Sequence, residues 1–301
     1  MTNNPHTTLI FGSGRSGTTW LAELLNCEST YRLLFEPFNA RKVESVRHFV
    51  FHSQYLRPTS QEPRYTTPIR AILAGEVDHP WVNRRPNTAT TVHILIKDIR
   101  ANMLVRWIKT HYPVLPMIFL MRHPCAVAMS RLELGWEFHL DEYLQQPKLI
   151  EDFLEPIAPR LTAITDPFEQ HLCTWAIENA VPLMQFQPGE VHVVFYEHLC
   201  IKFWNELQRL YEFLGSNRLP SGLADLQHRP SSLAMPHSAI TKGENLLTGW
   251  QARCTPSQID RALEILSWFG LDIIYGEQAL PLINDGQVAL QELDKHKIKI
   301  A

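Results

Sequence analysis

The stretch that decides the fold is residues 9–21, LIFGSGRSGTTWL. Its first three residues are apolar and predict a short buried strand, and the glycine-rich segment that follows leads directly into a predicted helix. Glycines let backbone N–H groups converge on an anion, and the N-terminus of a helix adds partial positive charge. The stretch therefore predicts a loop that holds a phosphate group.

This loop departs from the nucleotide P-loop at one position. Gly12 and Gly17 have the spacing of G-x-x-x-x-G-K-[ST], but Thr18 stands where the lysine would reach the β- and γ-phosphates. The nearest cation is Arg15, inside the loop. The pattern favours a phosphorylated nucleotide other than a triphosphate.

The composition indicates an ordinary globular protein. The chain has 301 residues, 45% hydrophobic and 20% charged, enough for one large α/β domain or two small ones. A formal net charge of −3 gives no basic field for nucleic acid or an anionic membrane. The five cysteines form no C-x-x-C pair, and we find neither a basic leader nor a membrane-length apolar run. We expect a cytoplasmic protein without membrane or nucleic-acid partners.

Short apolar runs alternate with helical patterns, which predicts a parallel sheet covered on both faces. The expected strands are residues 9–11, 31–35, 92–96, 117–121 and 191–196. The expected helices are residues 19–27, 101–112, 126–136, 168–185, 202–214 and one from Thr255 to about Trp268. We predict an α/β, P-loop-like fold of three layers with about five central strands.

The organisation predicts a single domain over residues 1–301. Two segments interrupt the alternation: residues 40–90, which are rich in arginine, and residues 140–167, which are rich in proline and acids. We interpret both as excursions near the acceptor side, because ligands of open α/β sheets bind beyond the strand ends. Solvated surface is the alternative for these arginines. Residues 286–301 are expected to form a peripheral C-terminal tail.

A second constellation is residues 119–131, FLMRHPCAVAMSR. Arg122 ends a predicted strand, and Ser130 lies about two turns into the following helix, so both should face one groove. A guanidinium offers a planar fork of donors to phosphate, and a serine adds a hydroxyl. Taken alone, an arginine at a strand end is more often a surface ion-pair partner.

Together the two stretches resemble the sulfotransferase family, whose cofactor is 3′-phosphoadenosine 5′-phosphosulfate (PAPS) and whose product is PAP. In that family the loop before the first helix binds the 5′-phosphosulfate, and an Arg…Ser pair eight residues apart binds the 3′-phosphate. The resemblance implies that no metal is needed. The cofactor-binding residues it implies are Gly14, Arg15, Ser16, Gly17, Thr18, Thr19, Trp20, Arg122, Ser130, Tyr196, Lys242 and Gly243.

Four of these residues have particular expected places. By the resemblance, Trp20 lies against the adenine, although a core aromatic on the first helix is the alternative. Tyr196, in residues 194–199 (VFYEHL), would lie near the base. Lys242-Gly243 is similar to a family loop that closes over the 3′-phosphate.

Sulfuryl transfer requires a base for the acceptor proton and a cation for the leaving oxygen. We predict Glu36, in residues 35–38 (FEPF), as the base, since apolar neighbours would raise its pKa. Carbohydrate and tyrosylprotein sulfotransferases carry a similar glutamate. A structural ion pair of Glu36 with Arg15 or Arg41 is the alternative. In the phenol- and steroid-type branch the base is a histidine just after the third strand. The matching residues here, 96–100, read IKDIR and contain no histidine.

Lys97 ends the third predicted strand. The resemblance to the tyrosine-sulfating branch assigns it, with Arg15, to stabilising the transferring group; pairing with Asp98 or another nearby carboxylate is the alternative. His123 and His237 remain alternative bases.

The sequence thus predicts sulfuryl transfer from PAPS to a hydroxyl, or to an amine or guanidine-like nitrogen, of a small polar acceptor such as a secondary metabolite or saccharide. Two alternatives stay open. One is a P-loop kinase or NTPase, with Asp98 as its magnesium ligand; the other is a PAP-binding protein without catalysis. The sequence makes no prediction of the oligomeric state.

Overall fold

The computed structural model describes residues 7–50, 52–84, 93–234, 241, 243 and 245–300, with side chains described to residue 293. Five parallel strands form its sheet, in the order β2-β3-β1-β4-β5. They are β1 (Thr7–Gly12), β2 (Arg32–Phe35), β3 (Ile94–Asp98), β4 (Met117–Met121) and β5 (His192–Phe195). The predicted α/β class and parallel sheet are confirmed, with strand ends displaced by up to two residues.

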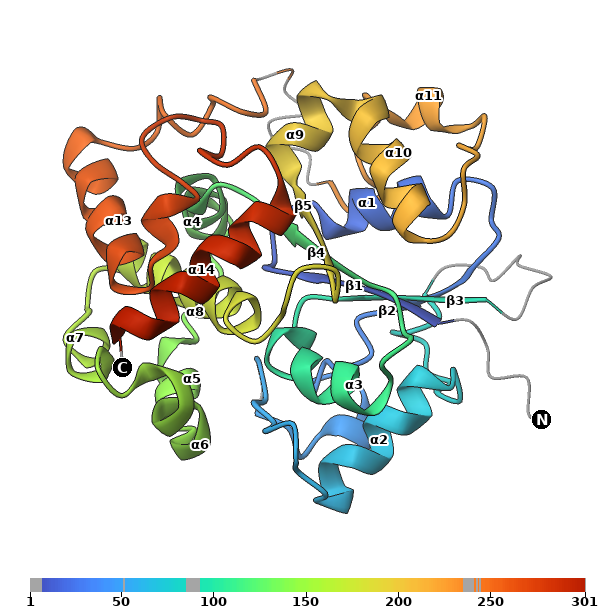
Figure 1. The fold of residues 1–301 in the computed structure, drawn as a ribbon, viewed down its shortest axis with the longest axis horizontal. Helices are drawn as coiled ribbons and strands as arrows, with labels where there is room; N and C mark the ends of the chain where they lie inside the picture. The colour runs from blue at the N-terminus through green and yellow to red at the C-terminus, as the bar shows by residue number, and fades with distance from the viewer. Residues whose placement is uncertain are drawn as a thin grey trace.

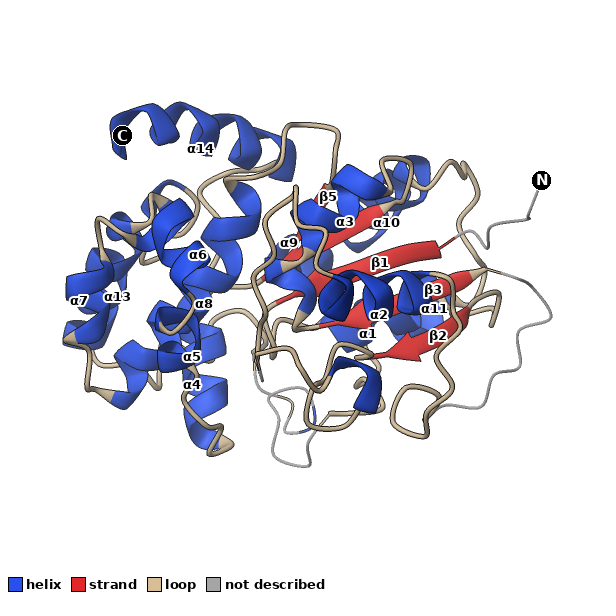
Figure 2. Ribbon diagram, turned by 90° about the horizontal axis from the view of Figure 1, so that it is seen from below, coloured by secondary structure: helices blue, strands red, loops and turns tan. Residues whose placement is uncertain are grey.

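Helices cover the sheet and extend beyond it (Figure 1, Figure 2). The α-helices are α1 (Thr18–Leu25), α2 (Pro63–Leu73), α3 (Val105–His111), α4 (Pro124–Glu133), α5 (Leu140–Leu144), α6 (Pro147–Leu149), α7 (Ala158–Thr162), α8 (Pro167–Leu183), α9 (Tyr196–Ile201), α10 (Phe203–Phe213), α11 (Leu223–Leu226), α13 (Pro256–Trp268) and α14 (Gly286–Ile300). Short turns are η1 (Glu44–Val46), η2 (Ala101–Met103), the π-type η3 (Ile150–Leu154) and η4 (Leu271–Ile273).

Alternation of side chains along the strands creates two buried clusters. Along β1, Leu9 and Phe11 belong to one cluster and Ile10 belongs to the other. The cluster of Ile10 lies under α1, α9, α10 and α11, and that of Leu9 and Phe11 is shared with α2, α3 and α8. Three layers follow, with a further group of helices (α4 to α8, α13 and α14) beside the sheet in Figure 1.

Two expected helices have different boundaries in the structure. The helix expected over 101–112 divides into η2 and α3. The helix expected over 126–136 is α4, which begins at Pro124 and ends at Glu133. Proline suits the first turn because its missing N–H would be unpaired there anyway.

Of the two segments outside the alternation, residues 140–167 are largely helical, whereas the described part of residues 40–90 contains η1 and α2. Residues 140–167 contain α5, α6, η3 and α7. The C-terminal α14 buries Ala289, Leu290 and Leu293 in the large core cluster, so it is more firmly packed than a peripheral tail. Among the described residues, no helix has both the length and the apolar character needed to cross a membrane.

All five strands run in the same direction, so their C-terminal ends share one edge of the sheet. The loop after β1, Glu36 after β2, Lys97 at the end of β3, Arg122 after β4 and Tyr196 after β5 all lie at this edge. Functional sites of open α/β sheets occur at this edge.

Candidate active site

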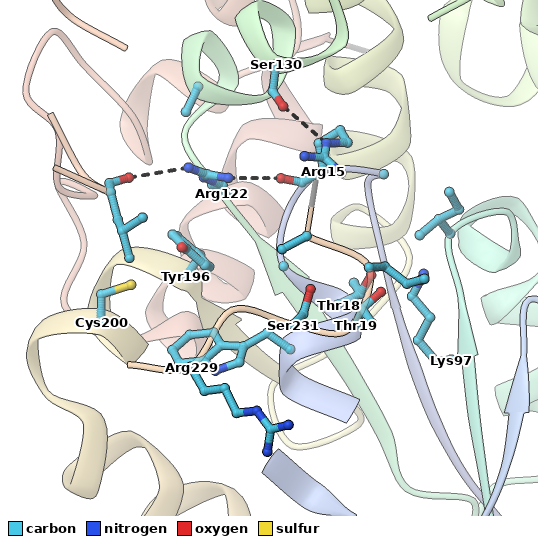
Figure 3. Close-up of a pocket in the computed structure, with 18 of the residues that line it drawn as sticks. Arg15, Thr18, Thr19, Lys97, Arg122, Ser130, Tyr196, Cys200, Arg229 and Ser231 are labelled. Atoms are coloured by element: carbon cyan, nitrogen blue, oxygen red, sulfur yellow. Dashed lines mark hydrogen bonds between the residues drawn. The ribbon is translucent and has the colours of Figure 1, made fainter. Parts of the chain in front are cut away.

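A cavity of about 300 Å³ opens at this edge of the sheet (Figure 3), a volume within the usual range for small-molecule sites. Most of the predicted site residues line it: Gly14, Arg15, Gly17, Thr18, Thr19, Trp20, Glu36, Lys97, Arg122, Ser130 and Tyr196. The structure therefore brings together side chains from all five strand ends. Gly243 is not among the residues that line it, and Lys242 lies outside the described residues.

The loop between β1 and α1 has a backbone that few residues adopt. Gly17 takes a φ of 97° and Arg15 a φ of 79°. A Cβ atom on Gly17 would lie 2.7 Å from Cδ2 of Tyr196, and one on Gly14 would lie 2.7 Å from the Trp136 ring. Glycine at 17 meets both demands, the left-handed conformation and the close approach of a ring.

Ser16 lies within this loop and is fully buried. Among the described residues, its hydroxyl has no hydrogen-bond partner. A buried hydroxyl without a partner is costly, and a phosphate or phosphosulfate group bound by the loop would offer it an oxygen. Ser16 itself is not among the residues that line the cavity.

Arg15, Arg122 and Ser130 form one connected group (Figure 3). Arg15 Nε donates to Ser130 Oγ at 3.1 Å, and Arg122 Nη1 donates to the Arg15 carbonyl at 3.1 Å. The Arg122 guanidinium also lies 4.4 Å from the centre of the Tyr196 ring. Burial, together with the charges of Arg122 and Arg131, lowers the pKa of Arg15. Two neighbouring guanidinium groups in a partly buried cavity favour an anionic ligand.

Trp20 is compatible with both places expected for it, against a bound base and in the core on the first helix. It is 9% exposed, its Nε1 donates to the Leu226 carbonyl at 3.1 Å, and its ring meets Tyr196 edge to face at 5.8 Å between centroids. It also lines the cavity. Trp20 is thus a packed aromatic of α1 that presents part of its surface to the ligand space.

Glu36 forms two buried ion pairs. Its Oε1 accepts from Lys97 Nζ at 2.6 Å and its Oε2 accepts from Arg100 Nη1 at 2.8 Å. The alternative for Glu36 was an ion pair with Arg15 or Arg41, but its partners come instead from β3 and the turn after it. Lys97 pairs with Glu36, which agrees with the alternative that Lys97 pairs with a nearby carboxylate.

The expected direction of the Glu36 pKa shift is wrong. Burial among apolar neighbours acts to raise the pKa of Glu36, as expected. The charges and hydrogen bonds of Lys97 and Arg100 outweigh burial and hold the pKa of this carboxyl below its usual range. Glu36 is consequently ionised at neutral pH.

Asp98 supports this arrangement from within the core. Its two oxygens accept from the backbone N–H groups of Phe38 at 2.8 Å and Arg100 at 2.6 Å. Burial and the nearby charge of Glu36 raise the pKa of Asp98 to about 6. Since both oxygens face the interior, Asp98 is poorly placed for the magnesium-ligand role considered above.

The other predicted bases have different placements. His123 is buried, stacks on Trp250 with ring centroids 4.1 Å apart and contacts the Gly276 carbonyl through Nε2 at 3.1 Å. Burial lowers the pKa of His123 to about 3, and it does not line the cavity. His237 lies outside the described residues. Within the described ranges, no group of three or more His, Cys, Asp or Glu side chains is placed to hold a metal.

The arginines of residues 40–90 serve mainly in surface pairs. Arg57 pairs with Glu151 at 2.6 Å and with Asp152 at 2.7 Å, and Arg41 pairs with Glu137 at 2.5 Å. The first of these pairings joins the two excursions to one another. The solvated-surface alternative suits these two arginines.

Several residues that line the cavity were not predicted from the sequence. They are Ile99, Glu133, Trp136, Cys200, Leu246, Arg253 and members of the segment 227–234. Of these, only Ile99 could have been predicted, because it follows shortly after the strand predicted over residues 92–96. The others come from helix ends and loops whose course depends on tertiary packing.

The parallel sheet and the glycine-rich loop at its edge define a P-loop-like α/β protein. The sulfotransferase family profile matches residues 8–219 of the chain. The chain belongs to the sulfotransferase family.

Solved structures that resemble the chain include two sulfotransferase domains and a mouse protein. The sulfotransferase domain of the Synechococcus PCC 7002 olefin synthase has a TM-score of 0.52 at 16% identity, covering 89% of this chain and 95% of its own. The sulfotransferase domain of the curacin biosynthetic pathway has a TM-score of 0.48 at 16% identity, covering 87% and 98%. Mouse sulfotransferase SULT7A1, complexed with PAP, has a TM-score of 0.43 at 14% identity, covering 97% and 88%. No curated protein matches the sequence.

Proposed function

We propose that this sulfotransferase moves the sulfuryl group of PAPS to a nucleophilic oxygen or nitrogen of a small polar acceptor. The observation that carries the proposal is the joining of the β1–α1 loop to Arg122 and Ser130 in one cavity through Arg15. Two elements that we propose to bind phosphate, far apart in the sequence, thus line one cavity, which supports a nucleotide with groups at both its 5′ and 3′ positions.

The residues present fit such a nucleotide. The buried Ser16 hydroxyl and the Nε of Arg122 have no hydrogen-bond partner within the described part of the chain. We assign the 5′ group to residues 14–19, the 3′-phosphate to Arg122 and Ser130, and the base to the aromatic wall of Trp20 and Tyr196. We retain Lys242-Gly243 as a proposed closing segment over the 3′-phosphate.

When bound, PAPS supplies an activated sulfuryl group on a phosphate leaving group. Lys97 pairs with Glu36 and, like it, lines the cavity, so it would stabilise charge that develops as the group moves. Arg15 would do the same from within the loop. Such cations affect turnover more than binding when their contacts strengthen in the transition state.

Glu36 is the proposed base. Its pairing with Lys97 and Arg100 fixes the carboxylate at the cavity and keeps it ionised, so it can accept the acceptor's proton at neutral pH. Its lowered pKa makes it a weaker base than a glutamate in a purely apolar pocket. Positioning then accounts for more of the rate than basicity does.

The acceptor is proposed to be small, polar and held on the Glu36 side of the cavity. Trp136 and Ile99, both close to Gly14, form apolar parts of the cavity lining, which suits a ring or short carbon chain bearing the nucleophile. A secondary metabolite and a saccharide both satisfy this description. We propose that the protein acts in the cytoplasm.

Transfer of ³⁵S from labelled PAPS to a panel of polar metabolites and saccharides tests the proposal. We expect a labelled product with the wild type, and with Glu36→Gln a loss of roughly 10²-fold or more in turnover. Binding of PAP to Glu36→Gln, measured by calorimetry, should stay within about threefold of wild type, because the base does not touch PAP. Near-normal turnover of Glu36→Gln with a true acceptor would exclude Glu36 as the base.

A further inference from the structure

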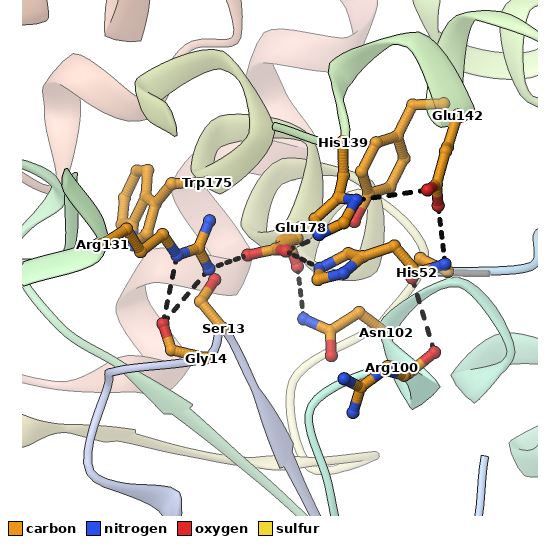
Figure 4. Close-up of polar contacts among 12 residues, drawn as sticks. Ser13, Gly14, His52, Arg100, Asn102, Arg131, His139, Glu142, Trp175 and Glu178 are labelled. Atoms are coloured by element: carbon orange, nitrogen blue, oxygen red, sulfur yellow. Dashed lines mark hydrogen bonds and ion pairs between the residues drawn. The ribbon is translucent and has the colours of Figure 1, made fainter. Parts of the chain in front are cut away.

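A buried guanidinium lies behind the phosphate-binding loop (Figure 4). Arg131 of α4 is 1% exposed, and its Nε and Nη2 donate to the Gly14 carbonyl at 3.3 and 3.1 Å. Its Nη2 also donates to Glu178 Oε2 at 2.7 Å. An arginine this deeply buried needs a carboxylate partner, and Glu178 of α8 is that partner.

Glu178 is fully buried and is bound on both oxygens. Its Oε1 accepts from the Tyr143 hydroxyl at 3.3 Å and lies 3.0 Å from His52 Nε2. Burial opposes its ionisation, but Arg131 and His52 outweigh burial and hold its pKa well below the usual range. Burial lowers the pKa of His52 to about 4. His52 is therefore neutral at pH 7, and the contact requires that its Nε2 carry the proton.

The carbonyl that Arg131 holds determines the direction of the next N–H. A trans peptide unit is planar, so its N–H points opposite to its carbonyl. With the Gly14 carbonyl bound to Arg131 behind the loop, the N–H of Arg15 points away from α4. Gly14 and Arg15 line the cavity, whereas Arg131 and Glu178 do not.

A second link from α8 reaches the same loop. Asn179, next to Glu178, donates through Nδ2 to Ser13 Oγ at 2.8 Å. Asn179 therefore holds Ser13 directly, and the preceding residue, Glu178, holds Gly14 through Arg131. These contacts adjoin Arg15, whose left-handed φ of 79° is unfavourable for a residue other than glycine unless the surroundings impose it.

We propose that Arg131 and Glu178 are a positioning pair that orients the Gly14–Arg15 peptide toward the 5′ end of the nucleotide. The pair touches neither substrate nor cofactor and acts through the Gly14 carbonyl. The inference rests on the proposed function, since it assigns the loop to the 5′-phosphosulfate.

Two ligands separate a positioning role from a merely structural one. PAP carries phosphates at both the 5′ and 3′ positions, whereas adenosine 3′-monophosphate lacks the 5′ group. A misdirected loop weakens PAP more than adenosine 3′-monophosphate, because the loop contacts the 5′ group directly, whereas the side chains of Arg122 and Ser130 hold the 3′ end. General damage to the fold weakens both ligands alike.

The experiment measures both dissociation constants for wild type, Glu178→Gln and Arg131→Lys by calorimetry. We expect the Kd for PAP to rise about tenfold in each variant, and that for adenosine 3′-monophosphate to change by less than about twofold. Arg131→Lys keeps a positive charge beside Glu178, so it provides a second variant should Glu178→Gln unfold. The KM for PAPS should rise in parallel.

Tyr143→Phe is the matched control, because it alters the other oxygen of Glu178 and leaves the Arg131 contact in place. Its ratio of the two dissociation constants should equal that of wild type. An unchanged Kd for PAP in the two test variants, or equal weakening of both ligands, would overturn the positioning role. Failure of the wild type itself to bind PAP would instead contradict the proposed function.

Discussion

Glu36 occupies a backbone conformation that non-glycine residues rarely adopt, with a φ of 44°. Lys97 and Arg100 bind its side chain, and Asp98 accepts from the N–H of Phe38 two residues later. Residues held in this region against a cost of about 1–3 kcal/mol concentrate at functional sites. The surrounding contacts therefore place the carboxylate at the cavity rather than merely burying it.

The pH dependence of stability provides a test of these ion pairs. Because the folded-state pKa of Glu36 is lowered from 4.5, its stabilising contribution is present above about pH 4.5 and is lost as pH falls through the folded value. Wild type should exceed Glu36→Gln by on the order of 3 kcal/mol in unfolding free energy at pH 7.

This difference should shrink as the pH is lowered below 4.5. Urea unfolding of both proteins at pH 7 and at successively lower values measures it. A difference that widens on acidification would show that Glu36 is not stabilised in its ionised form.

Gly17 is the loop position least tolerant of a side chain. An alanine there has to keep a φ of 97° and brings its Cβ within 2.7 Å of the Tyr196 ring. We expect Gly17→Ala to lose roughly 1–3 kcal/mol of stability and to weaken PAP binding at least about tenfold, because the ring and the loop must move apart.

Gly189→Ala is the matched control for this substitution. Gly189 has a similar φ of 87°, but a Cβ added there would meet nothing within 4 Å. It should lose about 1 kcal/mol of stability and bind PAP as wild type does. Equal PAP affinities for the two variants would argue that the contact of Gly17 with Tyr196 does not shape the site.

At the scale of elements, the loop and helix α1 were predictable because their signals are local. The apolar run, the glycine spacing and the strand-end Arg122 are each readable within about ten residues. The partners of Glu36 were not, since Lys97 and Arg100 come from β3 and the turn after it. The residues that flank Glu36 predicted its burial correctly. The charges that reverse the shift of its pKa belong to Lys97 and Arg100, more than sixty residues away in the sequence.

Helix α8 illustrates the other limit of sequence reasoning. The helix expected over residues 168–185 lies close to the observed helix, Pro167–Leu183. The side chains that it directs at the loop, Glu178 and Asn179, have no local signature. Their role depends on how α4 and α8 pack, which brings Arg131 between the helix and Gly14.

Asp166 caps α8, accepting from the N–H groups of Phe168 at 2.9 Å and Glu169 at 3.0 Å. Asp166→Ala should lower the unfolding free energy by about 1 kcal/mol. The Kd for PAP should stay within about twofold, because the helix is anchored along its length by buried residues. Chemical denaturation and calorimetry measure the two effects. A large loss of PAP affinity would mean that the start of α8 is coupled to the loop.

For the whole molecule, we propose that residues 1–301 work as one catalytic unit. One buried cluster runs from Leu9 of β1 to Leu293 of α14, so the sheet and the helical group beside it share a core. The two excursions meet through Arg57 and its acidic partners. The sequence predicted the sheet and its ligand-binding edge, but the joining of the excursions depends on pairings nearly one hundred residues apart.

The central claim is that the loop after β1 is built for a phosphosulfate nucleotide and not for a triphosphate. Calorimetric titration of the wild-type protein with PAP, and separately with ATP and Mg²⁺, tests it most directly. We expect saturable 1:1 binding of PAP and at least about hundredfold weaker binding of ATP–Mg²⁺, since Thr18 replaces the lysine that would reach the β- and γ-phosphates. Binding of ATP–Mg²⁺ without binding of PAP would contradict it.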